Sequence, residues 1–158
     1  MSDDAFQDHY PEALAHCYGC GRMNDAGLHV RSRWDGDETV ATITPGEQYM
    51  ATPGYVYGGL VASLIDCHGT GSAAGAMARR LGSEIPDDPR LRFVTASLHV
   101  DFLAPTPMGV PLTARGRIEE ITDKKVVTAI TVTAEGQRVA IGRVVAVRMP
   151  ATFQGAAG

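Results

Sequence analysis

The chain has 158 residues and a formal net charge of −4, with 44% hydrophobic and 20% charged residues. This length suits one domain, and the composition is that of a folded globular protein rather than a disordered chain. The acidic balance argues against a nucleic-acid-binding protein. Asp66 and His68 interrupt the most apolar stretch, residues 60–78, so we expect no membrane span. The chain starts without an apolar signal sequence, and three cysteines are too few for a disulfide framework, so we expect a cytoplasmic protein.

We expect an N-terminal arm over residues 1–16, loose or with a short helix, one domain over 17–150, and a frayed C-terminal tail over 151–158. Apolar and polar residues alternate over 27–34, which predicts the first strand. A turn at Asp35-Gly36-Asp37 then leads into a second strand over 38–44. Residues 45–56 contain two prolines and two glycines and are expected to form a loop.

From Gly58 to Leu81 the apolar residues follow a helical period, and Gly82 is a suitable helix stop. Many residues of this helix are glycine or alanine, which favours the close approach of a sheet. Alternation returns over 94–102, with Leu98 expected on one face and Thr95 on the other. Three more strands are expected near 111–121, 125–134 and 137–148.

These elements predict an α+β fold in which a curved, mainly antiparallel six-stranded sheet wraps around one long helix. One helix cannot cover both faces of such a sheet, so a homodimer is expected.

The helix start and Asp66 are the main candidates for chemistry. Gly58 and Gly59 place unpaired backbone N–H groups at the positive end of the helix dipole, where they can stabilise a carbonyl oxygen that gains negative charge. Asp66 lies among apolar and small residues, which suggests either a general base or an ion pair with Arg79 or Arg80. Gly58 and Asp66 are about 12 Å apart along one helix, so a common site would need Gly58 from one chain and Asp66 from another.

These motifs resemble those of the hot-dog-fold acyl-CoA thioesterases, especially the phenylacetyl-CoA-thioesterase-like branch, over roughly residues 17–148. Tyr57-Gly58-Gly59 is similar to the family's His-Gly-Gly, with Tyr57 in the place of the histidine, and Asp66 matches the acidic residue of the following helix. The resemblance implies hydrolysis of acyl-CoA to a free acid and coenzyme A, with no metal or redox cofactor. Asp66 would activate water or act as the nucleophile. The protein would form a homodimer or a dimer of dimers.

Two hydroxyls are candidates to orient the water. Thr70 lies one helical turn after Asp66. Thr95 lies ten positions before Pro105, where relatives place a Ser or Thr. Both alternatives stay open. For the coenzyme A phosphates we expect basic residues on the later strands and turns, namely Lys124, Lys125, Arg143 and, as a further candidate, Arg138.

The sequence also permits other interpretations. Cys17-x-x-Cys20 could begin a zinc site completed by His16 or by Cys67 and His68, but structural zinc usually has two ligand pairs, so packed thiols are favoured and no metal is expected. His68 is expected to be a hydrogen-bonded interior histidine. Alternative functions are a non-catalytic acyl-CoA-binding protein and a hydratase or dehydratase on the same fold.

Overall fold

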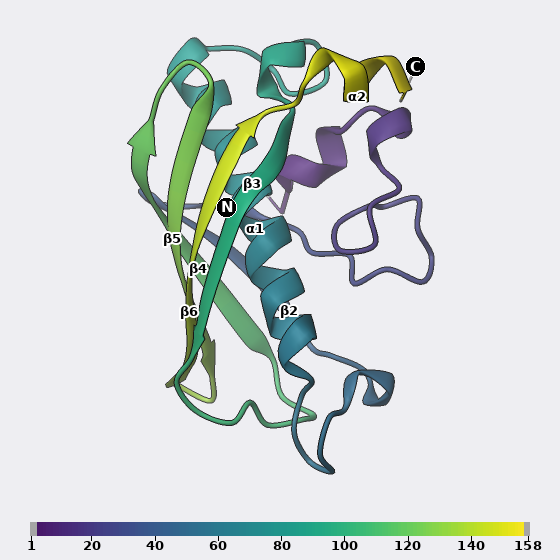
Figure 1. Ribbon diagram of the computed structural model, residues 1–158, viewed down its shortest axis with the longest axis vertical. Coiled ribbons are helices and arrows are strands. Elements are labelled where there is room, and N and C mark those ends of the chain that lie inside the picture. The colour runs from purple at the N-terminus through teal and green to yellow at the C-terminus, as the bar shows by residue number, and fades with distance from the viewer. Residues whose placement is uncertain (1–2, 157–158) are drawn as a thin grey trace.

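The computed structural model describes residues 3–156, and its central feature is one sheet that curves around the long helix α1, Gly58–Leu81 (Figure 1). The six strands pair antiparallel in the order β1-β2-β4-β5-β6-β3. Their bounds are Arg33–Asp35 (β1), Glu38–Ile43 (β2), Phe93–Phe102 (β3), Leu112–Ile121 (β4), Lys125–Ala134 (β5) and Gln137–Arg148 (β6). The expected α+β hot-dog architecture is therefore confirmed.

Small residues let the sheet approach α1 closely, as the sequence predicted. A Cβ added at Gly69 would lie 2.5 Å from the Cβ of Val144, which leaves no room for a side chain. The helix ends at Leu81, and the following Gly82 has a φ of 64°, the left-handed conformation that glycine adopts without strain. Within residues 3–156, no helix combines the length and hydropathy needed to cross a membrane.

The prediction of a strand over 27–34 was largely wrong, since β1 covers only Arg33–Asp35. His29 has a φ of 53°, which interrupts extended backbone. The N–H groups of Leu28 and Val30 donate to the carbonyls of Tyr18 and Gly19 at 2.9 Å each. The alternating segment thus pairs with the turn around Gly19 rather than with the sheet, an interaction that the apolar period does not reveal.

The expected loose arm is packed against the domain. It forms two 3-10 turns, Phe6–His9 and Glu12–Leu14, and Phe6 and Gln7 are buried. The Gln7 amide donates to the Ser32 hydroxyl at 3.1 Å and accepts from the Ser32 N–H at 2.7 Å. In Figure 1 this N-terminal segment, in purple, lies beside α1.

The expected frayed tail contains a short helix, α2, Ala151–Ala156. Residues 1–2 and 157–158 of the predicted arm and tail lie outside the described residues. The domain limits at 16 and 150 stay a prediction. Two further 3-10 turns cover Glu47–Tyr49 in the loop before α1 and Pro89–Leu91 before β3.

The strand β3 contains an irregularity that changes which residues face α1. Its register with β6 shifts between Thr95 and Ser97, since Thr95 pairs with Ala146 and Ser97 with Val145. The extra residue, Ala96, places Thr95 on the same inner face as Leu98. The expectation that Thr95 and Leu98 lie on opposite faces was therefore wrong, because strict alternation does not anticipate a β-bulge.

Candidate active site

A pocket of about 350 Å³ lies between the N-terminal segment, the middle of α1 and the start of β3. Three predicted catalytic residues, Asp66, Thr70 and Thr95, line it together. The remaining wall is mostly apolar and includes Leu14, Ile85, Leu91, Phe93 and Met149. A mostly apolar pocket with a few converging polar groups is the usual form of a small-molecule site.

Asp66 is half-buried in this pocket, and the Thr95 hydroxyl donates a hydrogen bond to its Oδ1. The bulge in β3 makes this contact possible because it turns Thr95 toward α1. Arg79 lies 3.5 Å over the ring of Trp34, and Arg80 pairs with Asp123 at 3.3 Å. Neither arginine therefore pairs with Asp66, and no ion pair to Asp66 is found among residues 3–156.

Thr70 also lines the pocket, but its hydroxyl serves the helix backbone. It donates toward the carbonyls of Cys67 at 3.2 Å and Asp66 at 3.4 Å. Threonine in a helix commonly satisfies its hydroxyl in this way. Of the two predicted hydroxyls, Thr95 is thus the one that contacts the carboxylate.

Gly58, Gly59 and Tyr57 lie at the start of α1, away from the Asp66 pocket of the same chain. Gly58 lines a separate hollow beside Phe102, whose Cζ would lie 3.2 Å from a Cβ added at Gly58. The ring of Tyr57 occupies the space that a Cβ at Gly59 would need. Within the described chain the N–H groups of Gly58 and Gly59 have no hydrogen-bond acceptor, so they are free to bind an oxygen from outside.

The predicted phosphate-binding residues separate into two places. Lys124 and Lys125 line a hollow of about 440 Å³ that shares Met149 with the Asp66 pocket, so the two cavities adjoin. Lys125 pairs with Glu120 at 3.0 Å. Arg143 pairs with Glu119 at 3.5 Å on the outer face of β6 and lines neither cavity.

Three thiols meet at one end of the pocket. Cys17 is exposed and Cys20 and Cys67 are buried, and all three are free. Hydrogen bonds from Cys20 and Cys67 to the sulfur lower the pKa of Cys17 to about 2. The hydrogen bond between Cys20 and Cys17 raises the pKa of Cys20 to about 12, because it stabilises the protonated form of Cys20. Cys17 is thus the thiol of this group that ionises first.

His68 is an interior residue, as predicted. It is fully buried, with Nδ1 2.8 Å from the Ser32 hydroxyl and Nε2 3.2 Å from that of Thr39. Burial lowers its pKa from 6.5 to about 4, so the ring is neutral at pH 7. His68 therefore supports the packing of α1 and lies outside the pocket of Asp66.

Sequence reasoning missed several residues of the pocket wall. Tyr10 and Arg92 both line it, and the buried Arg92 Nε has no hydrogen-bond partner among residues 3–156. Burial beside the three thiols raises the pKa of Tyr10. The local sequence pattern does not single out either residue. Tyr10 lies at the pocket because of how the N-terminal arm packs, and Arg92 because of how the loop before β3 packs. Cys67, which also lines the pocket, is one of the residues that the sequence suggested as partners of Cys17 and Cys20.

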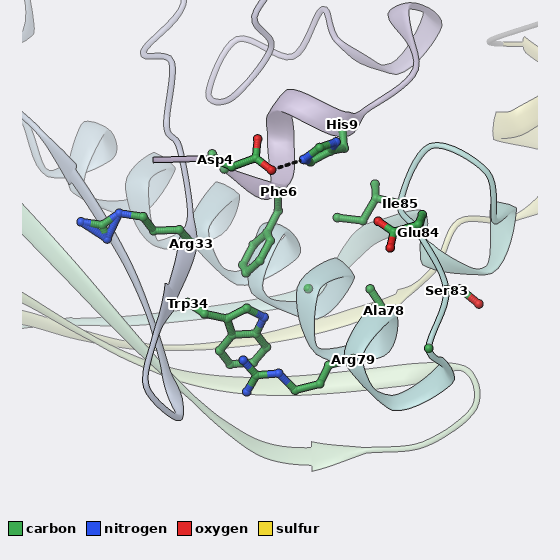
Figure 2. A pocket seen from close by; sticks show the side chains of 13 residues that line it. Asp4, Phe6, His9, Arg33, Trp34, Ala78, Arg79, Ser83, Glu84 and Ile85 are labelled. Atoms are coloured by element: carbon green, nitrogen blue, oxygen red, sulfur yellow. Dashed lines mark hydrogen bonds and ion pairs between the residues drawn. The ribbon is translucent and has the colours of Figure 1, made fainter. Parts of the chain in front are cut away.

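A larger cavity of about 570 Å³ lies near the C-terminal end of α1 (Figure 2). Its wall includes Phe6, Trp34 and Arg79, with the Phe6 and Trp34 rings 5.8 Å apart edge to face. The Phe6 ring also fills the space above Gly75, where a Cβ would lie 2.5 Å from its Cζ. No predicted catalytic or substrate-binding residue lines this cavity, so the Asp66 pocket is the candidate active site.

Comparisons with known proteins agree on one protein family. A family model described as "Thioesterase superfamily" matches residues 53–141. The solved structure of a thioesterase superfamily protein from Shewanella loihica is 45% identical, covers 87% of this chain and 97% of its own, and has a TM-score of 0.66. No curated protein matches the chain.

Two more distant structures are also similar. A thioesterase from Haemophilus influenzae is 18% identical, with 81% of this chain and 83% of its own covered and a TM-score of 0.64. A phenylacetic acid degradation-related protein from Ralstonia eutropha is 18% identical, with 76% and 85% covered and a TM-score of 0.60. At these identities the likeness concerns the fold alone.

Proposed function

Because the chain belongs to the thioesterase superfamily, we propose that it hydrolyses an acyl-coenzyme A thioester to the free carboxylic acid and coenzyme A. The hydrogen bond from Thr95 to Asp66 at the wall of a mostly apolar pocket is the observation that carries the proposal. The carboxylate is held in place but forms no ion pair within the described part of the chain, which suits a group that accepts a proton or attacks a carbonyl. The apolar wall would hold the acyl group.

In this mechanism Asp66 takes a proton from water while the water oxygen attacks the thioester carbonyl carbon. The tetrahedral intermediate then breaks its carbon–sulfur bond and releases coenzyme A as a thiolate, which takes up the proton that Asp66 accepted and leaves Asp66 ionised again. Thr95 donates its own hydrogen to Asp66, so its oxygen is left to accept a hydrogen bond from the water. Direct attack by Asp66 to form an anhydride is the alternative course, and water would then hydrolyse the anhydride.

The carbonyl oxygen needs a hydrogen-bond donor, and we assign that role to Gly58 and Gly59 of a second protomer, because their N–H groups have no acceptor among the described residues. In the sheet formed by the described residues, β3 lies at the edge and pairs with β6 alone. Its inner face carries exposed apolar side chains, with Leu98 40% and Phe102 56% accessible. A long apolar edge strand of this kind favours pairing with another chain.

We propose for such a pair the register that sets Thr95 of one protomer against Phe102 of the other. An antiparallel pairing of two β3 strands about Leu98 and His99 places Phe102 of one protomer opposite Thr95 of the other. Phe102 contacts Gly58 and Thr95 contacts Asp66, so the same pairing brings the helix start of one chain toward the carboxylate of its partner. Each homodimer would then contain two sites, and further assembly into a dimer of dimers would leave them intact.

The Lys124 and Lys125 hollow is the proposed place for the coenzyme A phosphates. It adjoins the pocket at Met149, and lysine ammonium groups bind phosphate as point charges. Tyr57 packs its ring against Gly59, and its proposed role is to keep the helix start in position.

The proposal is tested by following thiol release from short, medium, long and aromatic acyl-CoA substrates. We expect turnover of at least one class, and Asp66→Asn should lower kcat by at least about 100-fold while the protein stays folded. Asp37→Asn, in the exposed turn between β1 and β2, is a matched control and should keep wild-type activity. Tight acyl-CoA binding without thiol release would instead support a non-catalytic binding protein, and hydration of an enoyl-CoA would support a hydratase.

A further inference from the structure

The three thiols beside Asp66 form a compact cluster that the hydrolytic mechanism does not use. The Sγ atoms of Cys17, Cys20 and Cys67 all lie within 4.8 Å of one another. Those of Cys17 and Cys67 are 3.8 Å apart. Zinc binds thiolate at about 2.3 Å in a tetrahedron, which places neighbouring sulfurs about 3.8 Å apart. One sulfur pair already has this spacing, and the others reach it when their separation shortens by no more than about 1 Å.

We propose that Cys17, Cys20 and Cys67 bind one thiophilic divalent ion of the zinc class. Three sulfur ligands exclude a magnesium or calcium site, since those ions prefer oxygen. The sequence alone favoured packed thiols because it shows only the Cys17-x-x-Cys20 pair. The third ligand comes from the middle of α1, and only the packing of the N-terminal segment against that helix brings it to the pair.

The backbone around Cys17 and Cys20 is arranged before any ion binds. The Gly21 N–H donates to the Cys17 carbonyl at 2.8 Å, and the Val30 N–H to the Gly19 carbonyl at 2.9 Å. Gly19 lies directly against the Cys67 sulfur, where any Cβ would collide with it. The turn can therefore approach α1 only with glycine at position 19. An ion would enter a site whose ligands are already close, at little cost in chain ordering.

Three protein ligands leave the fourth position of the tetrahedron open. All three cysteines line the same pocket as Asp66, from which water would take this position. Each thiol gives up its proton as its sulfur–metal bond forms. The ion would fasten the N-terminal segment to α1 one residue beyond Asp66, and the site exists whether or not the chain hydrolyses thioesters.

The test measures metal binding by the full-length protein under reducing conditions. After zinc loading and dialysis, mass spectrometry of the metal should give about one zinc per protomer. Cobalt substituted for zinc should produce the sulfur-to-cobalt charge-transfer absorption and the strong visible bands of tetrahedral thiolate coordination. Zinc should also slow alkylation of the exposed Cys17 by at least about tenfold.

Variants identify the ligands. Cys17→Ser removes an exposed ligand and should abolish the charge-transfer absorption. Cys20→Ser removes a buried ligand and should also abolish this absorption. His16→Ala, next to Cys17 but outside the cluster, should bind cobalt with an unchanged spectrum. The proposal is overturned if the reduced wild type keeps less than about a tenth of an equivalent of zinc, if Cys17→Ser binds cobalt as the wild type does, or if His16→Ala loses binding. Recovery of the cysteines as a disulfide under these reducing conditions would also overturn it.

Discussion

The hydroxyl of Thr95 donates a hydrogen bond to Oδ1 of Asp66, joining the edge strand β3 to the central helix α1. One extra residue in β3, Ala96, makes this contact possible, because without the bulge Thr95 and Leu98 would face opposite sides of the sheet. The irregular strand β3 therefore contributes a side chain to the pocket as well as pairing in the sheet. Bulges commonly redirect side chains next to active sites.

Removing the Thr95 hydroxyl should lower turnover more than substrate binding. Thr95→Val keeps the shape of the side chain, and we expect kcat to fall by about 10- to 100-fold with KM nearly unchanged, since the hydroxyl orients the carboxylate and its water. Thr95→Ser should restore most of kcat. Equal activity of the valine and serine variants in steady-state thiol-release assays would show that the hydroxyl has no positioning role.

Two inactive variants should complement each other if the site is shared between protomers. Asp66→Asn removes the base, and Gly58→Val blocks the helix start beside Phe102. A heterodimer of these two chains has one site with both changes and one site with neither. After the two proteins are mixed, dissociated and reassembled, we expect about a quarter of the wild-type activity per protomer. Activity no higher than the sum of the two separate variants would place all catalytic groups in one chain.

Charge on the inner face of β3 should separate the protomers. Leu98→Asp puts a carboxylate into the proposed interface, and we expect light scattering to report a monomer with little activity. Phe153→Asp makes the same kind of change at another exposed apolar residue, in α2, and should leave the dimer intact. A Leu98→Asp protein that is still dimeric would exclude the β3 edge as the interface.

Neutralising the basic hollow should weaken the binding of coenzyme A thioesters. Lys124→Ala with Lys125→Ala should raise KM by about tenfold with little change in kcat, and rising salt should reduce the difference from wild type. Arg117→Ala, an exposed arginine elsewhere on the sheet, is the control. If Arg143→Ala raises KM and the lysine pair does not, the phosphates bind at the outer face of β6 instead.

His68 should make the fold sensitive to acid. Its folded-state pKa of about 4 lies below the unfolded value of 6.5, so the unfolded chain binds more protons between these pH values. The contribution of the neutral ring is complete above pH 6.5 and is lost as pH falls toward 4. Between pH 7 and pH 5 this loss lowers the free energy of unfolding by about 2 kcal/mol. His68→Gln should be less stable at pH 7 but should lose less stability at pH 5 in denaturant titrations. An unchanged pH dependence would contradict the assignment.

The limits of α1 and of the later strands could be predicted because they depend on local patterns. The helix begins at Gly58 and ends before Gly82, where period and stop signal agree, and strands 125–134 and 137–148 match β5 and β6. Asp66 and the helix-start glycines became candidate site residues because they are unusual residues in a regular element. Each of these signals lies within a few residues of the feature that it predicts.

The remaining features depend on contacts between distant segments. The residues of 27–34 alternate as a strand does, yet most of them pair with the turn around Gly19, because backbone N–H groups bond to whichever carbonyls packing brings near. The choice between Thr95 and Thr70 as the partner of Asp66 required the bulge and the local hydrogen bonds. The meeting of Cys67 with Cys17 and Cys20 required the arm to lie against α1. Periodicity records which side of an element is apolar, whereas the neighbour of each side chain is set by how the elements pack.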